Sequence, residues 1–347
     1  MKGTEWCRGM NKILTIVVPT YNAEKYLRRN LDSFCMSTIL KDIEVLVVND
    51  GSTDNSLTIA EEYAARFPDS YRVITKENGG HGSGINCGIQ NASGFYFKVV
   101  DADDWVDQKS FCHLVEMLKK KKADVVYSGF LWVYDHGDEA ASRYRRKAEI
   151  KKPFKNVVFE KKYRFDAVAK DLYIKMHHMT IRTDILRKHQ IKIDENCFYV
   201  DMEYVTFPIP YVQSICFMKE YVYMYRIGSQ SQSVGIEKMQ QNECDYTRVF
   251  HSLLNFYNGL GKTIPCTAAK KQYIAKIIAR MVAGKIKIML SFPGNRKKKR
   301  ELEVFDKKIK SIYPEIYYGN VNKGVSILRS SRYLMYYPAS ILVRKRY

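Results

Sequence analysis

The sequence predicts an α/β protein with a mostly parallel central sheet flanked by helices, followed by a C-terminal helical region. Short apolar runs recur through the first hundred residues, a polar loop follows each run, and segments with helical spacing separate consecutive runs. Repeats of strand, loop and helix are typical of open parallel sheets. The expected strands are residues 13–18, 43–48, 71–75 and 96–100, and the expected helices are residues 23–34, a segment after Asp54, and residues 85–92.

Each element has a local signal in the sequence. The first two strands are uninterrupted β-branched runs, which suit strands buried on both faces of a sheet. The first helix repeats apolar residues at helical spacing, and Asp54 is placed to cap the second helix. Four polar loops follow the strands, at residues 19–22, 49–54, 79–84 and 101–104. Because ligands bind beyond the carboxyl ends of strands in such sheets, the four loops together indicate a nucleotide site.

The last of these loops holds three carboxylates, Asp101, Asp103 and Asp104. Carboxylates so close together repel one another and are costly to bury, so they need a counter-charge. Clustered oxygen ligands suit a hard divalent cation such as Mg²⁺ or Mn²⁺. The alternative for this loop alone is a solvated acidic turn.

Four segments in this order and spacing resemble the family 2 inverting glycosyltransferases with the GT-A fold. They read VVPTYNAEKYL, EVLVVNDGSTDNS, ENGGHGSGINCG and DADDW, and the resemblance covers about residues 12–230. It implies a sugar transferase that uses a nucleotide-sugar donor, usually a UDP-sugar, together with a divalent metal.

The resemblance also implies roles for single residues. Asp103 would be a metal ligand, and Asp101 would face the ribose or the metal. The uracil and ribose pocket would be lined by Pro19, Thr20 and Tyr21, and Asp50 would hydrogen-bond the uracil ring. The alternatives are that Tyr21 only fastens its turn to the following helix and that Asp50 is an ordinary turn residue.

Two further donor contacts are expected. Gly80 lets the backbone approach a ligand closely, and the adjoining His81 is placed to reach a phosphate or a sugar hydroxyl. Arg226 offers the fork of donors that suits a phosphate, and relatives often carry an Arg and a Ser-rich loop at this place. The alternatives are an ordinary loop histidine and a polar exit loop over residues 227–233.

Direct displacement with inversion needs a base for the acceptor hydroxyl, and a carboxylate can serve. Relatives carry a Glu-Asp pair ahead of a helix, whereas this chain has Asp201-Met202-Glu203. Asp201 is the predicted base and Glu203 the second candidate. The alternative makes Asp201 the N-cap of a helix over residues 202–212. The pair His177 and His178 has no third ligand at zinc spacing and is interpreted as packing residues, with acceptor hydrogen bonding as the alternative.

Composition narrows the setting. Eight cysteines are scattered without a Cys-x-x-Cys pair, which suits a reducing cytosol. The sequence has no recognisable secretory signal and no apolar run of about 18 residues or more that would span a membrane. We therefore expect a cytoplasmic protein that is soluble or peripheral to the inner face of the cell membrane.

Positive charge is concentrated at the C-terminal end. The net charge is +20, and residues 261–347 contain 21 Lys or Arg against 4 Asp or Glu. Helices are expected over residues 238–259 and 266–292, with another opening in the basic block 296–300. Aromatic and aliphatic groups beside basic ones suit an anionic bilayer surface, so this region is predicted to dock on the membrane near a polyprenyl-linked acceptor. The alternative is a helical cap on the sheet domain.

The combined prediction is a catalytic domain over residues 1–230 and a basic helical region over residues 231–347. The enzyme would move a hexose or N-acetylhexosamine from a UDP-sugar to a glycan or lipid-linked hydroxyl in cell-surface polysaccharide synthesis. The altered Asp201-Met202-Glu203 segment keeps a catalytically silent partner subunit as an alternative. Nucleic-acid binding is disfavoured despite the pI of about 9.4, because no recognition motif accompanies the charge.

Overall fold

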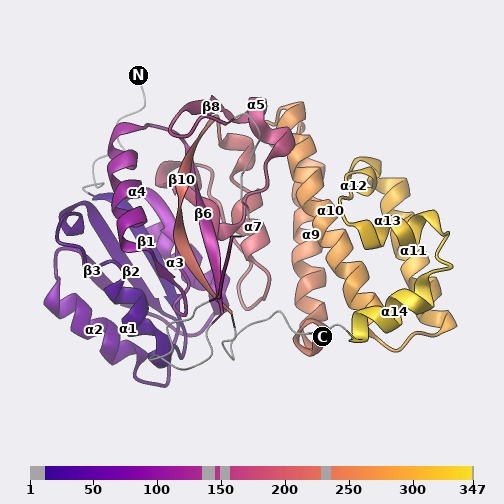
Figure 1. The fold of residues 1–347 in the computed structure, drawn as a ribbon, viewed down its shortest axis with the longest axis horizontal. Helices are drawn as coiled ribbons and strands as arrows, with labels where there is room; N and C mark the ends of the chain where they lie inside the picture. Colours follow the sequence, from indigo (N-terminus) through magenta and orange to yellow (C-terminus); the bar gives the residue numbers. More distant parts are fainter. Residues whose placement is uncertain (1–11, 135–144, 149–156, 228–235, 346–347) are drawn as a thin grey trace. The chain divides into compact units, whose positions relative to one another are not determined.

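Two compact units, Met1–Gln230 and Ser231–Tyr347, make up the chain. The computed structural model describes residues 12–134, 145–148, 157–227 and 236–345. Figure 1 shows a sheet flanked by helices in the N-terminal unit and helices alone in the C-terminal unit.

Four parallel strands form the first half of the sheet, in the order β3-β2-β1-β4. Each lies within two residues of its expected position. Apart from the partly buried Ile13, the β-branched side chains of β1 and β2 are buried, as the apolar runs predicted. The strands are β1 (Lys12–Thr20), β2 (Ile43–Asn49), β3 (Tyr71–Thr75) and β4 (Gly94–Val99).

Beyond β4 the sheet is mixed. Strand β9 runs antiparallel between β4 and β6, whereas β10 runs parallel to β6. Strand β10 is not at the edge of the sheet, because it has β6 on one side and the short strands β5 and β8 on the other. The strands are β5 (Trp105–Val106), β6 (Val125–Tyr134), β7 (Arg145–Ala148), β8 (Lys162–Arg164), β9 (Met179–Arg182) and β10 (Ser214–Ile227).

Helices cover the sheet, and the residues at which they begin determine how long the loops at its carboxyl edge are. The third helix begins at Gly80 rather than at residue 85, so most of the expected glycine-rich loop is helical. Its start is fixed by the Asp50 carboxylate, which accepts the N–H groups of Gly79 and Gly80. The helices are α1 (Glu24–Asp32), α2 (Ser56–Arg66), α3 (Gly80–Asn91), α4 (Gln108–Lys120), α5 (Phe165–Val168), α6 (Thr183–Lys188) and α7 (Asp201–Thr206).

Helix α7 is shorter than the expected helix over residues 202–212. Pro208 and Pro210 follow it closely, and proline lacks the N–H that continues an α-helix. A 3₁₀ turn, Ile209–Tyr211, takes the place of the second half.

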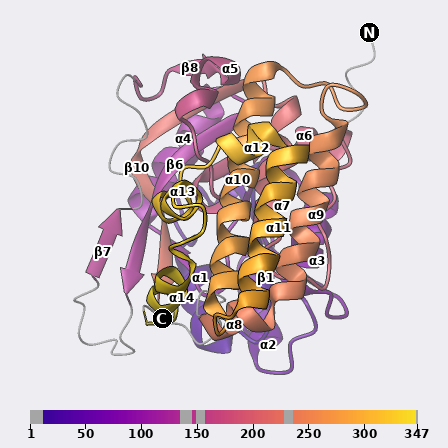
Figure 2. The ribbon, with the colours of Figure 1, turned by 90° about the vertical axis from the view of Figure 1, so that its right-hand side faces the viewer.

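The C-terminal unit consists of helices in the part that the structure describes (Figure 2). The expected helix over residues 238–259 is broken at Asn242, which takes the N-cap position of α9. No described helix has both the length and the apolar character needed to cross a membrane. The helices are α8 (Ile236–Gln241), α9 (Glu243–Gly259), α10 (Ala268–Ser291), α11 (Arg296–Ile312), α12 (Pro314–Tyr318), α13 (Lys323–Ser330) and α14 (Tyr336–Lys345).

A buried ion pair joins α11 to α13. The Asp306 side chain is fully buried, and the Arg329 guanidinium donates to both of its oxygens at 2.7 and 2.9 Å. The Tyr333 hydroxyl donates to Asp306 at 2.8 Å. Buried charge is tolerated here because every carboxylate oxygen has a donor.

Candidate active site

The acidic turn after β4 is held in place by groups from distant parts of the chain. The side-chain amide of Asn30, fully buried on α1, donates to the main-chain oxygens of Asp101 and Asp104, both at 2.9 Å. The Asp101 N–H donates to the hydroxyl of Tyr223 on β10 at 3.2 Å. The turn is therefore rigidly placed at the carboxyl edge of the sheet.

Asp104 is the buried acid of the turn, with 1% of its surface exposed. Its carboxylate accepts the Tyr223 hydroxyl at 2.5 Å and the Arg226 N–H at 2.7 Å. Burial raises the pKa of Asp104 well above its ordinary value, and the nearby charges of Asp103 and Asp101 raise it further. A cation beside this carboxylate would relieve both effects.

Asp101 pairs with His81, whose Nε2 lies 2.8 Å from Oδ1 of Asp101. Burial opposes ionisation of Asp101, but the charge and hydrogen bond of His81 hold its pKa below the ordinary value. Burial likewise opposes protonation of His81, yet the charges of Asp101, Asp201 and Asp103 raise the pKa of the imidazole. The charges of three carboxylates therefore act on this histidine.

His177 comes into the same site from the segment before β9. Ligand atoms of Asp101, Asp104 and His177 all lie within 4.8 Å of one another. The imidazole packs among the rings of Phe130 and Tyr223, with ring centroids 4.8 and 4.7 Å away. Its Nδ1 is buried and has no hydrogen-bond partner among the described residues. The interpretation of His177 as a mere packing residue missed this, because Asp101 and Asp104 are more than 70 residues away in sequence.

His177 is held by a lysine that the sequence analysis did not single out. Lys98 is fully buried in β4, and its Nζ donates to the main-chain oxygens of His177 and Met179 at 3.0 and 3.3 Å. Burial lowers the pKa of Lys98 to about 7 and that of His177 to about 3, so the imidazole is neutral near pH 7. Lys98 could have been singled out from the sequence, because it is a lone charged residue inside an apolar strand.

Asp201 is the first residue of α7, and Val200 takes the N-cap position. Burial raises the pKa of Asp201 to about 6, and the charge of Asp101 adds to this while that of His81 opposes it. Glu203 is fully buried, and its Oε2 accepts the Asp194 N–H at 2.8 Å. Of the two candidate bases, Asp201 thus interacts electrostatically with the acidic turn, whereas Glu203 is hydrogen-bonded to the loop that contains Asp194.

The residues predicted to bind the nucleotide-sugar donor lie along the same carboxyl edge of the sheet. Thr20 is buried at the end of β1, with its hydroxyl donating to the Val18 oxygen at 3.0 Å, whereas Tyr21 is 54% exposed. Asp50 is buried and accepts Lys76 Nζ at 2.7 Å and the Gly80 N–H at 2.7 Å. In the described structure, Asp50 therefore fixes the start of α3.

Gly80 and Pro19 are two more of the residues predicted to bind the nucleotide-sugar donor. Gly80 adopts a φ of +80°, a conformation that suits glycine. A Cβ added at Gly84 would lie 2.9 Å from Cβ of Pro19, so α3 packs closely on the end of β1.

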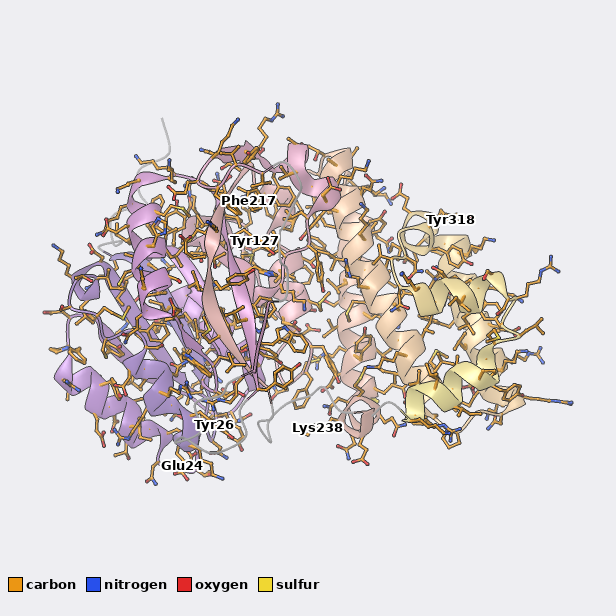
Figure 3. The ribbon with its side chains drawn as sticks, in the orientation of Figure 1. Glu24, Tyr26, Tyr127, Phe217, Lys238 and Tyr318 are labelled. Atoms are coloured by element: carbon orange, nitrogen blue, oxygen red, sulfur yellow. The ribbon has the colours of Figure 1, made fainter. Side chains whose placement is uncertain are left out.

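Arg226 is almost fully buried and braces the acidic turn. Its Nε donates to the main-chain oxygen of Asp103 at 2.7 Å. Its guanidinium lies 4.7 Å from the ring of Tyr26, labelled in Figure 3, and 5.0 Å from the ring of Trp105. Most of the Ser-rich loop expected over residues 227–233 lies outside the described residues.

The protein family described as Glycosyl transferase family 2 matches this chain over residues 15–189, which is half of its length. The chain belongs to this family. The family 2 chain is 26% identical over 299 residues to the uncharacterized glycosyltransferase EpsJ of Bacillus subtilis, covering 86% of this chain and 85% of EpsJ. It is also 26% identical over 257 residues to the minor teichoic acid biosynthesis protein GgaB of the same organism, covering 73% of this chain and 27% of GgaB.

The fold is shared with a solved structure that contains a bound nucleotide sugar. S. aureus TarS 1–349 in complex with UDP-GlcNAc superposes with a TM-score of 0.61 at 17% identity, covering 96% of this chain and 90% of that one. This confirms the expected GT-A fold and its C-terminal helical region. Membership of the family makes the chain a glycosyltransferase.

Proposed function

We propose that this enzyme moves a hexose or N-acetylhexosamine from a UDP-sugar to a hydroxyl of a glycan or lipid-linked acceptor, inverting the anomeric carbon. The observation that carries the proposal is the meeting of Asp101, Asp104 and His177 around the carboxyl end of β4, where the charge of Asp101 also acts on Asp201. The UDP-GlcNAc in TarS supports a UDP-sugar as donor.

The residues of this site fit a divalent cation, Mn²⁺ or Mg²⁺. A buried carboxylate with a raised pKa and an imidazole nitrogen without a partner among the described residues are both suited to a metal. Asp101, Asp104 and His177 would hold it, and Asp103 remains the predicted ligand from the family motif. When bound, the ion stabilises negative charge on the departing diphosphate.

Asp201 acts as the general base in this proposal. Its raised pKa makes it a stronger base than an ordinary aspartate, yet it is ionised at neutral pH. It accepts the proton of the acceptor hydroxyl as that oxygen attacks the sugar. The uridine contacts are assigned to Pro19, Thr20, Tyr21 and Asp50, and the diphosphate contacts to Gly80, His81 and Arg226.

The base sets the pH dependence of the reaction. We expect kcat/KM to fall about tenfold per pH unit below about pH 6, because protonation removes the ionised form of Asp201. Rates measured from pH 4.5 to 8 test this. The residual activity of Asp201→Asn should lack this limb, and a limb that persists there would assign it to another group.

His177 is expected to contribute to metal affinity. Loss of residues that merely orient metal ligands costs about 10–100-fold in affinity, so His177→Ala should weaken Mn²⁺ binding at least tenfold. Titration of Mn²⁺ followed by electron paramagnetic resonance measures this without turnover. His113→Ala, at a half-exposed contact with Glu220, is the control and should bind Mn²⁺ normally. Unchanged affinity in His177→Ala would remove His177 from the metal site.

The acceptor belongs to a cell-surface polysaccharide pathway in this proposal, as the GgaB relative suggests. The basic helical region would hold the enzyme on the inner face of the membrane, where a polyprenyl-linked acceptor is presented. Sedimentation with anionic and neutral vesicles tests the docking, and equal binding to both would contradict an electrostatic contact.

A further inference from the structure

A cavity of about 670 Å³ lies within the C-terminal unit, lined by α10, α13, α14 and the segment before α13. Figure 2 shows these three helices in that unit. Its walls include buried Ile286, Leu290 and Leu328, which belong to the packed interior of the unit. This volume falls in the range of about 300–1,000 Å³ that small-molecule sites occupy.

The polar part of the cavity carries one sign of charge. Arg280, Lys287 and Lys323 line it, and none of the described lining residues has a carboxylate side chain. The surrounding sequence has the same bias, because no Asp or Glu occurs after Glu315. The basic residues of that segment are Lys323, Arg329, Arg332, Arg344, Lys345 and Arg346. A ligand for this cavity therefore carries negative charge.

The mouth of the cavity is apolar and exposed. Val321 and Leu342 line the cavity, and each leaves more than half of its surface exposed. Ile341 on α14 and Leu334 in the turn before α14 are exposed as well, Leu334 to 75%. A set of exposed apolar residues beside cations is the combination that meets a lipid, whose chain is apolar and whose headgroup is charged.

We propose that this cavity binds one molecule of an anionic lipid. The acyl or isoprenyl chain enters between α10, α13 and α14, and the phosphate lies against Lys287 and Lys323. This goes beyond docking on a charged surface, because it requires a defined site with one lipid per chain. It concerns the C-terminal helices alone and does not depend on sugar transfer.

The charge part of the proposal is tested with the full chain and vesicles of 30% phosphatidylglycerol in phosphatidylcholine. Lys287→Glu/Lys323→Glu is compared with Lys307→Glu/Lys308→Glu, which makes the same change of charge at exposed positions on α11 outside the cavity. We expect the cavity pair to weaken vesicle binding at least tenfold more than the control pair. Equal losses would reduce the interaction to diffuse attraction and overturn the cavity site.

The chain part is tested by calorimetry with farnesyl phosphate below its micelle concentration. We expect saturable binding of one molecule per chain, with farnesol and inorganic phosphate each at least tenfold weaker. Ala339→Trp, which fills the cavity, should weaken binding at least tenfold, whereas Ser311→Trp on α11 should not.

Thermal unfolding separates loss of the site from loss of the fold. If Ala339→Trp does not fold, the charge pair decides the question. Absence of saturable binding to the wild-type chain overturns the proposal, as does concentration-dependent dimerisation that Leu342→Glu abolishes, because a second copy would then cover the cavity.

Discussion

Asp201→Asn is expected to lower the rate of sugar transfer by about 10²–10⁴-fold, the usual contribution of a general base. Donor binding should stay near the wild-type level, because Asn has the same shape and Asp201 acts on the acceptor. Transfer is measured by mass spectrometry of the product, and donor binding by calorimetry.

The matched control is Glu203→Gln. The Glu203 side chain accepts the Asp194 N–H, and a glutamine oxygen can still do so. We therefore expect transfer within a few-fold of wild type. Transfer within tenfold of wild type in Asp201→Asn, together with its loss in Glu203→Gln, would reverse the assignment.

Asp306→Ala is expected to destabilise the C-terminal unit by about 3–5 kcal/mol. The substitution leaves the largely buried Arg329 guanidinium without its carboxylate, and an uncompensated buried charge is among the costliest defects in a fold. The free energy of unfolding from urea titration, followed by circular dichroism, measures the loss.

Two comparisons isolate the buried charge as the cause. Glu301→Ala removes a half-exposed ion pair with Lys298 on the same helix and should cost less than about 1 kcal/mol. Asp306→Ala/Arg329→Met should recover much of the stability, because no buried charge is then unpaired. If the single Asp306 variant is as stable as wild type, the pair does not support the fold.

Local sequence signals predicted the first half of the fold well. Strands β1 to β4 were recognisable in the sequence as apolar runs, and the loops at their ends were recognisable from their polar residues. Boundaries failed where a distant group or a proline set them, as at Gly80, which Asp50 caps, and at Pro208, which ends α7.

The site was predictable in part for the same reason. The acidic turn, Asp201 and His81 could be chosen from motifs, and their roles stay predictions. His177 and Tyr223 could not be joined to Asp104 from the sequence, because the contacts run between distant segments that only the folded sheet brings together. Contacts between residues so far apart in the chain produce no regular spacing that the sequence analysis could recognise.

The most direct test of the account is UDP release from a panel of UDP-sugars incubated with the wild-type chain and Mn²⁺. We expect slow hydrolysis of at least one donor, suppressed by EDTA and by Asp101→Asn. Failure to bind or consume any UDP-sugar would favour a silent partner subunit. Consumption that continues undiminished with EDTA present would contradict a metal held by the acidic turn.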